Sequence, residues 1–195
     1  NILLNAARIF QRENLILNNV DFTVYKGEFL YLIGRTGSGK TTIGRLIFRL
    51  YDVKTGSIKI NDTDLREAKV ESIRRNIAIV TQDVQLFRAS IRDNLTFFDR
   101  SIPDEKILAT LEELELGDWY RGLPKGLDTQ LDTGSRSLSA GEAQLLAFTR
   151  VFLRNPGLVI LDEASSRLDP ATEQHLARAI DKLLQNRTAI IIAHR

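Results

Sequence analysis

The chain has 195 residues, of which 43% are hydrophobic and 27% charged, and its formal net charge is +2. This length and composition fit one globular domain, or one domain with a smaller lobe. Both signs of charge are mixed along the sequence, which argues against the clustered basic face of a nucleic-acid-binding protein. The absence of cysteine excludes disulfides, thiolate metal sites and cysteine nucleophiles.

The first part of the chain carries strand patterns followed by a helical one. The alternation in Val20–Val24 predicts a strand with one exposed face, whereas Phe29–Ile33 is apolar throughout and predicts a buried parallel strand. A helical pattern begins at Gly39, with apolar residues at spacings of three and four: Ile43, Leu46, Ile47 and Leu50. A further strand is predicted over Ile77–Val80, and it ends in polar residues.

From Asp83 to Arg154 the patterns are mostly helical, and Ser139 suits the N-terminus of one of these helices. A buried strand, "GLVILDE", follows Pro156, then a helix with Pro170 at its first position, then the strand "TAIIIAHR". Strands that alternate with helices predict an α/β fold with a mainly parallel sheet. The longest apolar runs are strand-sized and fall short of the roughly 20 residues that span a bilayer.

A phosphate-binding motif follows the apolar strand Phe29–Ile33. The segment "GRTGSGKTT" matches G-x-x-x-x-G-K-[ST] between a predicted strand and a predicted helix. Glycines let successive backbone N–H groups turn toward a polyphosphate, and the helix N-terminus adds positive potential. We therefore expect nucleotide binding by Lys40 and by the surrounding loop residues, which are Gly34, Thr36, Gly37, Ser38, Gly39, Thr41 and Thr42.

A pair of carboxylates complements this loop. Asp162 ends the buried strand "LVILD", which places it beside the end of the strand before the loop. With the hydroxyl of Thr41 it is a candidate Mg²⁺ ligand, and Glu163 is placed to polarise an attacking water as a general base. These residues predict a P-loop NTPase that uses Mg²⁺, which is a very broad class.

The middle of the chain narrows the class further. It contains "LSAGE" (Leu138 to Glu142) at a predicted helix N-terminus before the Asp162 strand. With the phosphate loop and the carboxylates, this segment resembles the nucleotide-binding domain of an ATP-binding cassette (ABC) protein, whose signature is LSGGQ. The resemblance runs over essentially all of the chain, and Ala140 and Glu142 depart from the signature.

The resemblance implies roles for further residues. Gln82 resembles the family's Q-loop glutamine, which touches Mg²⁺ and senses the γ-phosphate, and His194 resembles the switch histidine, so that Lys40, Gln82, Glu163 and His194 form the implied catalytic set. "SSRLD", ending at Asp169, resembles the D-loop, and Phe10 falls where the family places an aromatic ring on adenine. From the residues alone, Phe10 also fits a core position, Gln82 an ordinary surface position and His194 an ordinary loop.

The resemblance also implies a domain organisation. We expect a P-loop NTPase (RecA-like) core over 1–82 and 156–195, with an N-terminal antiparallel β region. A helical subdomain carrying the signature is expected over 83–155. Since the family continues beyond the switch histidine and the chain begins without methionine, we expect a C-terminally truncated piece of a longer polypeptide.

In the family, two such domains pack head to tail around ATP. The resemblance implies that Ser139, Ala140 and Gly141 meet the γ-phosphate of ATP bound by a second nucleotide-binding domain, in a homodimer or a heterodimer. The methyl group of Ala140 and the charge of Glu142 are expected to weaken that contact. A transmembrane domain, fused upstream, is the second implied partner, and the cytoplasmic face of a membrane is the implied location.

The segments "DVQLFRASIRDNLTF" and "RGLPKGLDTQL" resemble exporter-type domains. The favoured interpretation is therefore a domain that hydrolyses ATP to power export across a membrane. Two alternatives stay open: a separate ATPase subunit of an importer or release system, and a soluble ABC ATPase of DNA repair or translation.

Overall fold

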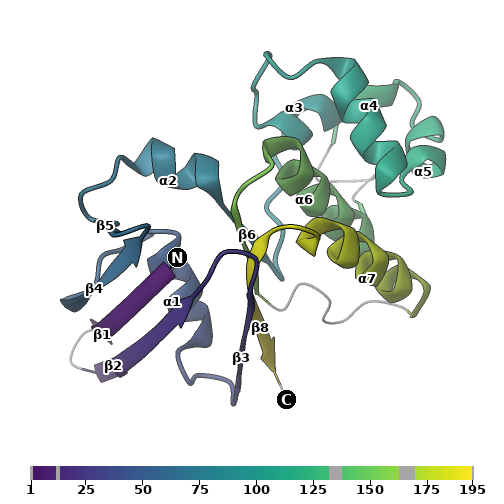
Figure 1. Cartoon of the computed structure of the whole chain (residues 1–195). Helices are drawn as coiled ribbons and strands as arrows, with labels where there is room; N and C mark the ends of the chain where they lie inside the picture. Colours follow the sequence, from purple (N-terminus) through teal and green to yellow (C-terminus); the bar gives the residue numbers. More distant parts are fainter. Residues whose placement is uncertain (1, 12–13, 132–137, 163–169, 195) are drawn as a thin grey trace. The chain divides into compact units, whose positions relative to one another are not determined.

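A computed structural model describes residues 2–11, 14–131, 138–162 and 170–194 (Figure 1). The chain forms two compact units, which are described separately below. The first contains Asn1–Ile79, Pro156–Glu163 and Asn186–Arg195, and the second contains Val80–Asn155 and Ala164–Gln185. The helix at 170–184, which the sequence analysis grouped with the ATP-binding core, thus belongs to the second, mostly helical unit.

An antiparallel sheet opens the first unit. Its strands lie in the order β2-β1-β4-β5, with bounds Asn14–Val24, Ile2–Gln11, Thr55–Ile60 and Thr63–Asp64. In β2 Val24 is buried while Asp21 and Thr23 are exposed. The half-exposed strand predicted from the alternation at Val20–Val24 is therefore confirmed.

A second sheet has the order β3-β8-β7-β6, with bounds Phe29–Gly34, Thr188–His194, Leu158–Asp162 and Ile77–Thr81. The β3–β8 and β8–β7 pairs are parallel. Every residue of β7 is buried, as its uninterrupted apolar run predicts. The register pairs Gly34 with His194, and Asp162 with Ile192, so the carboxyl ends of these strands meet at one edge of the sheet.

The prediction of a buried strand at Phe29–Ile33 is wrong in one respect. The strand is parallel, but Phe29, Tyr31 and Ile33 are 46%, 56% and 53% exposed. Among the described strands β3 lies at the edge of its sheet, and no described residue covers one of its faces. An apolar run therefore does not by itself distinguish a central strand from an edge strand that leaves one face open.

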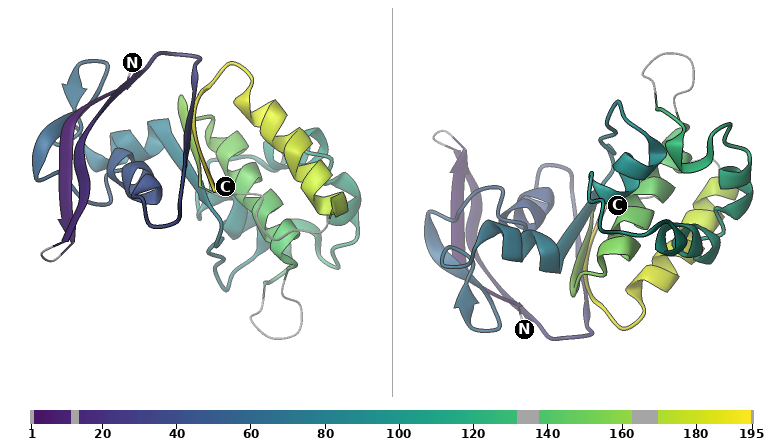
Figure 2. Two further views of the ribbon diagram at one scale, coloured as in Figure 1. Left: turned by 90° about the horizontal axis from the view of Figure 1, so that it is seen from below. Right: turned by 90° about the horizontal axis from the view of Figure 1, so that it is seen from above.

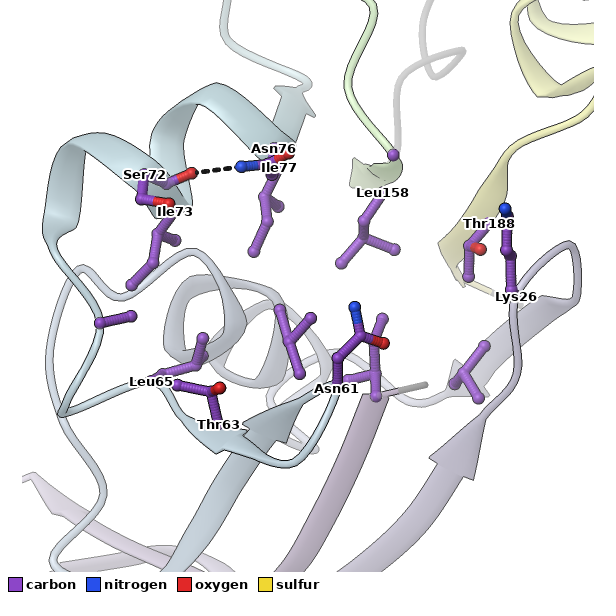
Figure 3. Close-up of a pocket in the computed structure, with 15 residues that line it drawn as sticks. Lys26, Asn61, Thr63, Leu65, Ser72, Ile73, Asn76, Ile77, Leu158 and Thr188 are labelled. Atoms are coloured by element: carbon purple, nitrogen blue, oxygen red, sulfur yellow. Dashed lines mark hydrogen bonds between the residues drawn. The ribbon is translucent and has the colours of Figure 1, made fainter.

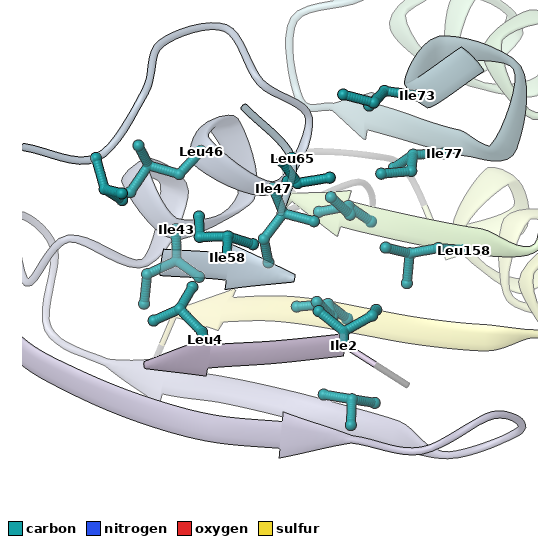
Figure 4. Packing of buried hydrophobic residues seen from close by; sticks show 14 of the residues in the cluster. Ile2, Leu4, Ile43, Leu46, Ile47, Ile58, Leu65, Ile73, Ile77 and Leu158 are labelled. Carbon is teal, nitrogen blue, oxygen red and sulfur yellow. The ribbon is translucent and has the colours of Figure 1, made fainter. Parts of the chain in front are cut away.

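Helix α1 (Lys40–Ile47) attaches the loop after β3 to the core of the first unit. Its buried face, with Ile43, Leu46 and Ile47, packs among Leu4, Ile58 and other apolar side chains (Figure 4). The helix ends earlier than predicted, because Phe48 forms its C-cap and Arg49 takes a left-handed φ of 52°. Leu50 accordingly lies outside the helix and is 51% exposed. A short helix, α2 (Val70–Asn76), leads into β6.

The second unit is mostly helical. It contains α3 (Ile91–Thr96), α4 (Asp104–Glu113), α5 (Gly117–Arg121), a 3₁₀ turn at Gly126–Asp128, α6 (Ala140–Arg154) and α7 (Pro170–Leu184). Helices α6 and α7 lie side by side in both views of Figure 2. Phe148 of α6 is fully buried. Within the described ranges, no helix combines the length and apolar character needed to cross a membrane.

Candidate nucleotide site

The loop between β3 and α1 has the backbone that the phosphate-binding motif requires. Gly37 and Gly39 adopt φ angles of 82° and 92°, which residues with side chains rarely take. A Cβ at Gly39 would lie 2.6 Å from the Leu17 side chain, whereas one at Gly37 would meet nothing within 4 Å. Gly39 is therefore dictated by close packing as well as by its φ angle. Thr36 and Ser38 lie in the same turn, and Thr42 lies in the first turn of α1.

Lys40 is the first residue of α1, and its side chain folds over the loop. Its Nζ donates hydrogen bonds to the carbonyl oxygens of Gly34 at 2.7 Å and Arg35 at 2.9 Å. The residue is only 7% exposed. A buried ammonium held by loop carbonyls is a cation fixed at the place where the motif predicts phosphate charge.

The two predicted metal ligands are in direct contact. The Thr41 hydroxyl donates a 3.1 Å hydrogen bond to Oδ1 of Asp162, although the residues are 121 positions apart in sequence. Asp162 is 7% exposed, at the carboxyl end of β7. A hydroxyl and a carboxylate are hard oxygen donors of the kind that Mg²⁺ prefers when it also binds phosphate. In the described part of the chain, no group of three His, Asp or Glu side chains offers a competing metal site.

For the other predicted residues of this site, the structure gives at most the position of the backbone in its strand or segment. The backbone of His194 pairs with Gly34, so His194 lies beside the start of the loop. Phe10 lies near the end of β1, opposite Leu15 of β2. Glu163 and Asp169 lie outside the described residues. Gln82 follows β6 in the second unit, so its position relative to Thr41 and Asp162 is not defined.

The signature-like segment forms the start of α6 in the second unit. Ser139 is the N-cap, as predicted, and Ala140 and Gly141 form the first turn. The Ser139 hydroxyl accepts a 3.2 Å hydrogen bond from the Glu142 N–H, while the Glu142 carboxylate accepts one of 2.7 Å from the Ser139 N–H. This capping box satisfies helix N–H groups reciprocally. The acidic residue that departs from the signature therefore has a structural role that the sequence analysis did not predict.

Two more residues of α6 were not singled out from sequence. Gln144 donates hydrogen bonds to the carbonyl oxygens of Thr81 and Gln82, and Arg150 donates to that of Gln85 at 2.9 Å. Burial, and then the nearby Arg154 cation, lower the pKa of Arg150 to about 10. Arg150 therefore stays charged at neutral pH. The available signal was the presence of polar side chains within a mostly apolar stretch of helix, but this pattern does not identify their partners.

A cavity of about 520 Å³ also lies in the first unit (Figure 3). It is lined by Leu158 and Thr188, the first residues of β7 and β8, and by Lys26 and Asn61. The cavity therefore lies at the amino ends of the parallel strands, whereas Asp162 and the loop after Gly34 lie at their carboxyl ends. Ligands of open parallel sheets bind at the carboxyl ends, so we do not assign this cavity to the nucleotide.

Comparison with known proteins gives a consistent result. Residues 17–166 match the protein family described as ABC transporter. An ATP-dependent lipid A-core flippase of Haemophilus influenzae is 38% identical over 185 residues, which cover 94% of the chain and 32% of the flippase. An ATP-binding cassette sub-family B member 6 of Xenopus tropicalis is 39% identical over 180 residues, covering 92% of the chain and 21% of that protein.

A solved structure of a bacterial Atm1-family ABC exporter with ATP bound is also similar. The TM-score is 0.89 with 32% sequence identity, and the match covers 100% of the chain and 34% of the exporter chain. The chain thus spans about a third of the length of the flippase and of the exporter.

Proposed function

The chain belongs to the ABC transporter family as an ATP-binding, exporter-type ATPase domain, and on this premise we propose that it powers export of a substrate across a membrane. The single observation that carries the assignment to particular residues is the contact between Thr41 and Asp162, beside the buried ammonium of Lys40. Two elements far apart in sequence supply these groups: the start of α1 supplies the cation and the hydroxyl of the proposed nucleotide–magnesium site, and the end of β7 supplies the carboxylate.

In the proposed site, the loop N–H groups and Lys40 bind the phosphates of ATP. Lys40 exchanges its bonds to the Gly34 and Arg35 carbonyls for bonds to phosphate oxygens. Thr41, Asp162 and Gln82 would hold Mg²⁺, and the ion would neutralise charge on the phosphates. Glu163 orients and deprotonates the attacking water, and His194 contacts the γ-phosphate. Phe10 stacks on the adenine.

The proposed partner is a second nucleotide-binding domain, packed head to tail. Ser139, Ala140 and Gly141 face the ATP of that partner, since the first N–H groups of α6 form an anion site. Asp169, in the segment that resembles the D-loop, is a further proposed nucleotide-binding residue. ATP then holds the two domains together, and hydrolysis releases them. The second proposed partner is a transmembrane domain fused upstream in the natural protein, through which this domain lies at the cytoplasmic face of a membrane. The similar proteins named as flippase and exporter favour this function over an importer subunit or a soluble ATPase.

Substitution of Lys40 by alanine tests the assignment. Lys40→Ala leaves phosphate charge unmatched, so we expect ATP affinity to fall about 10-fold or more, as measured by calorimetry. Lys69→Ala is the matched control, because Lys69 is an exposed lysine at the N-cap of α2 in the same unit. Equal ATP affinity of the two variants would show that Lys40 does not bind phosphate.

A further inference from the structure

Gln144 lies two residues beyond the signature-like segment, on the second turn of α6. It is 4% exposed. Its Nε2 donates two hydrogen bonds, to the carbonyl oxygen of Thr81 at 3.1 Å and to that of Gln82 at 2.8 Å. All three residues belong to the second unit. One side chain therefore connects the signature helix to the peptide groups on both sides of the Gln82 Cα.

The chemistry of this contact requires a hydrogen-bond donor. Both partners are backbone carbonyl oxygens, which only accept, so the nitrogen of the amide must face them. The Oε1 atom of the same amide is buried and accepts no hydrogen bond within the described residues. Among the described residues, the polar contacts of the Gln144 side chain are therefore its two donated hydrogen bonds to these carbonyls.

Within the part of the chain that the structure describes, other hydrogen bonds hold the segment after β6 at residues beside Gln82. The Thr81 hydroxyl donates to the Asp83 carbonyl within the same turn, and Arg150 donates to the Gln85 carbonyl further along. Asn94 anchors the following residues by accepting from the Phe87 N–H. Of these contacts, only the one from Gln144 joins the peptide groups of Gln82 to the helix that begins with Ser139.

We propose that Gln144 is a positioning residue that fixes the backbone of Gln82 to the signature helix. The inference rests on the proposed function, in which Gln82 responds to the γ-phosphate and the start of α6 meets the ATP of the partner. Through Gln144 a displacement of Gln82 is transmitted directly to α6, so the two nucleotide-responsive segments of one chain move together. Gln144 itself touches no reacting atom.

Three substitutions of Gln144 distinguish the effect of hydrogen-bond donation from the effect of side-chain shape. Gln144→Met keeps length and volume without a donor, and Gln144→Glu keeps the shape but only accepts at neutral pH. Gln144→Lys restores a donor of similar reach, as Lys40 shows by donating to two carbonyls while buried. Thr149→Val is the control. It also removes a buried hydrogen bond of α6, from Thr149 to the Leu145 carbonyl, but that bond stays within the helix.

The measurements are steady-state ATP hydrolysis by the complete natural protein and the carbonyl ¹³C resonances of Thr81 and Gln82 in the 195-residue chain. We expect Gln144→Met and Gln144→Glu to lower kcat about 10-fold or more, with ADP affinity unchanged, because the site loses alignment but keeps its phosphate loop. Both carbonyl resonances should move upfield. Gln144→Lys should recover part of kcat, and Thr149→Val should match the wild type.

A kcat for Gln144→Met within about twofold of the wild type would overturn the proposal, as would an equal loss in Thr149→Val. If Gln144→Met does not fold, the comparison of Gln144→Lys with Gln144→Glu tests the proposal instead. Equal kcat values for these two variants would overturn the proposal. A wild type that neither binds nor hydrolyses ATP would instead refute the proposed function. The carbonyl resonances would then still show whether Gln144 holds the Gln82 backbone.

Discussion

Gly39 illustrates how one residue of the phosphate loop is determined by both its backbone and its neighbours. Its φ of 92° strains any residue with a Cβ, and that Cβ would lie 2.6 Å from the Leu17 side chain and 3.3 Å from the Ile16 carbonyl oxygen. We expect Gly39→Ala to lower the free energy of unfolding by about 2 kcal/mol or more, through backbone strain and overpacking. Urea denaturation measures this loss.

Gly37→Ala is the matched comparison, because Gly37 has a similar φ of 82° with open space around the missing side chain. It should cost about 1 kcal/mol, from backbone strain alone. Equal losses for the two variants would show that the contact with Leu17 does not restrict Gly39.

Glu142 has two opposing effects at the start of α6. Its carboxylate accepts a hydrogen bond from the Ser139 N–H, which stabilises the helix. The same charge lies where the proposed partner brings the γ-phosphate of its ATP. A neutral residue of equal length should keep the first effect and remove the second.

We therefore expect Glu142→Gln to strengthen ATP-dependent association of two domains by about fivefold, since it removes a repulsion of roughly 1 kcal/mol between partly solvated charges. Glu142→Ala also removes the charge but breaks the capping box, at about 1 kcal/mol of stability. Sedimentation with ATP compares the variants. Weaker or unchanged association of Glu142→Gln would mean that the charge does not face phosphate.

At the scale of elements, α6 organises the second unit through Arg150. Its Nε donates to the Asn94 carbonyl at 2.6 Å, and other guanidinium nitrogens donate to the Gln85 carbonyl and to Asn94 Oδ1. The guanidinium also lies 4.7 Å from the centre of the Phe97 ring. This single side chain joins α6 to α3 and to the segment after Gln82.

Arg150→Met should lower the free energy of unfolding by about 2–4 kcal/mol, because it leaves buried carbonyls without donors. Arg154→Met is the control. Arg154 also stacks on Phe97, at 4.4 Å, but it is more exposed, so its loss should cost about 1 kcal/mol or less. Chemical denaturation of both variants measures the two losses of unfolding free energy. Similar losses would show that the hydrogen bonds from Arg150 to the carbonyl oxygens do not stabilise the unit.

The elements predicted from sequence are those whose causes are local. Ser139 carries its own capping chemistry, the apolar run of β7 is interrupted by no charge, and the phosphate loop is defined by its glycines. The exposure of Tyr31 was not predictable, because it depends on the place of β3 in the sheet order. The hydrogen-bond partners of Gln144 could not be predicted from the sequence either. They lie 62 and 63 positions away, so the contact depends on the tertiary fold.

The residues of the candidate site also differ in whether a local motif or the tertiary fold determines them. The motif around Lys40 identified the phosphate loop directly. The contact of Thr41 with Asp162 was inferred from the expectation that their two strands end side by side, whereas β8 lies between β3 and β7 in the sheet. The structure brings these two side chains together. The roles of Gln82 and His194 follow from the family resemblance and that of Glu163 from its place beside Asp162, and all three are proposals.

At the scale of the whole molecule, the proposed function gives the chain two incomplete halves of a nucleotide site. The phosphate loop with Asp162 lies in the first unit, and the N-terminus of α6 lies in the second. In the proposed head-to-tail dimer, each ATP is bound by the first half of one domain and the second half of its partner. Bound ATP then favours association, and its hydrolysis reverses it.

Glu163→Gln tests this account most directly, because it separates ATP binding from ATP turnover. The amide keeps the size of the side chain but cannot take a proton from water, so turnover by the complete natural protein should fall about 100-fold or more. ATP affinity and ATP-dependent association should persist. Turnover equal to that of the wild type would contradict the account, since water activation would then not depend on Glu163.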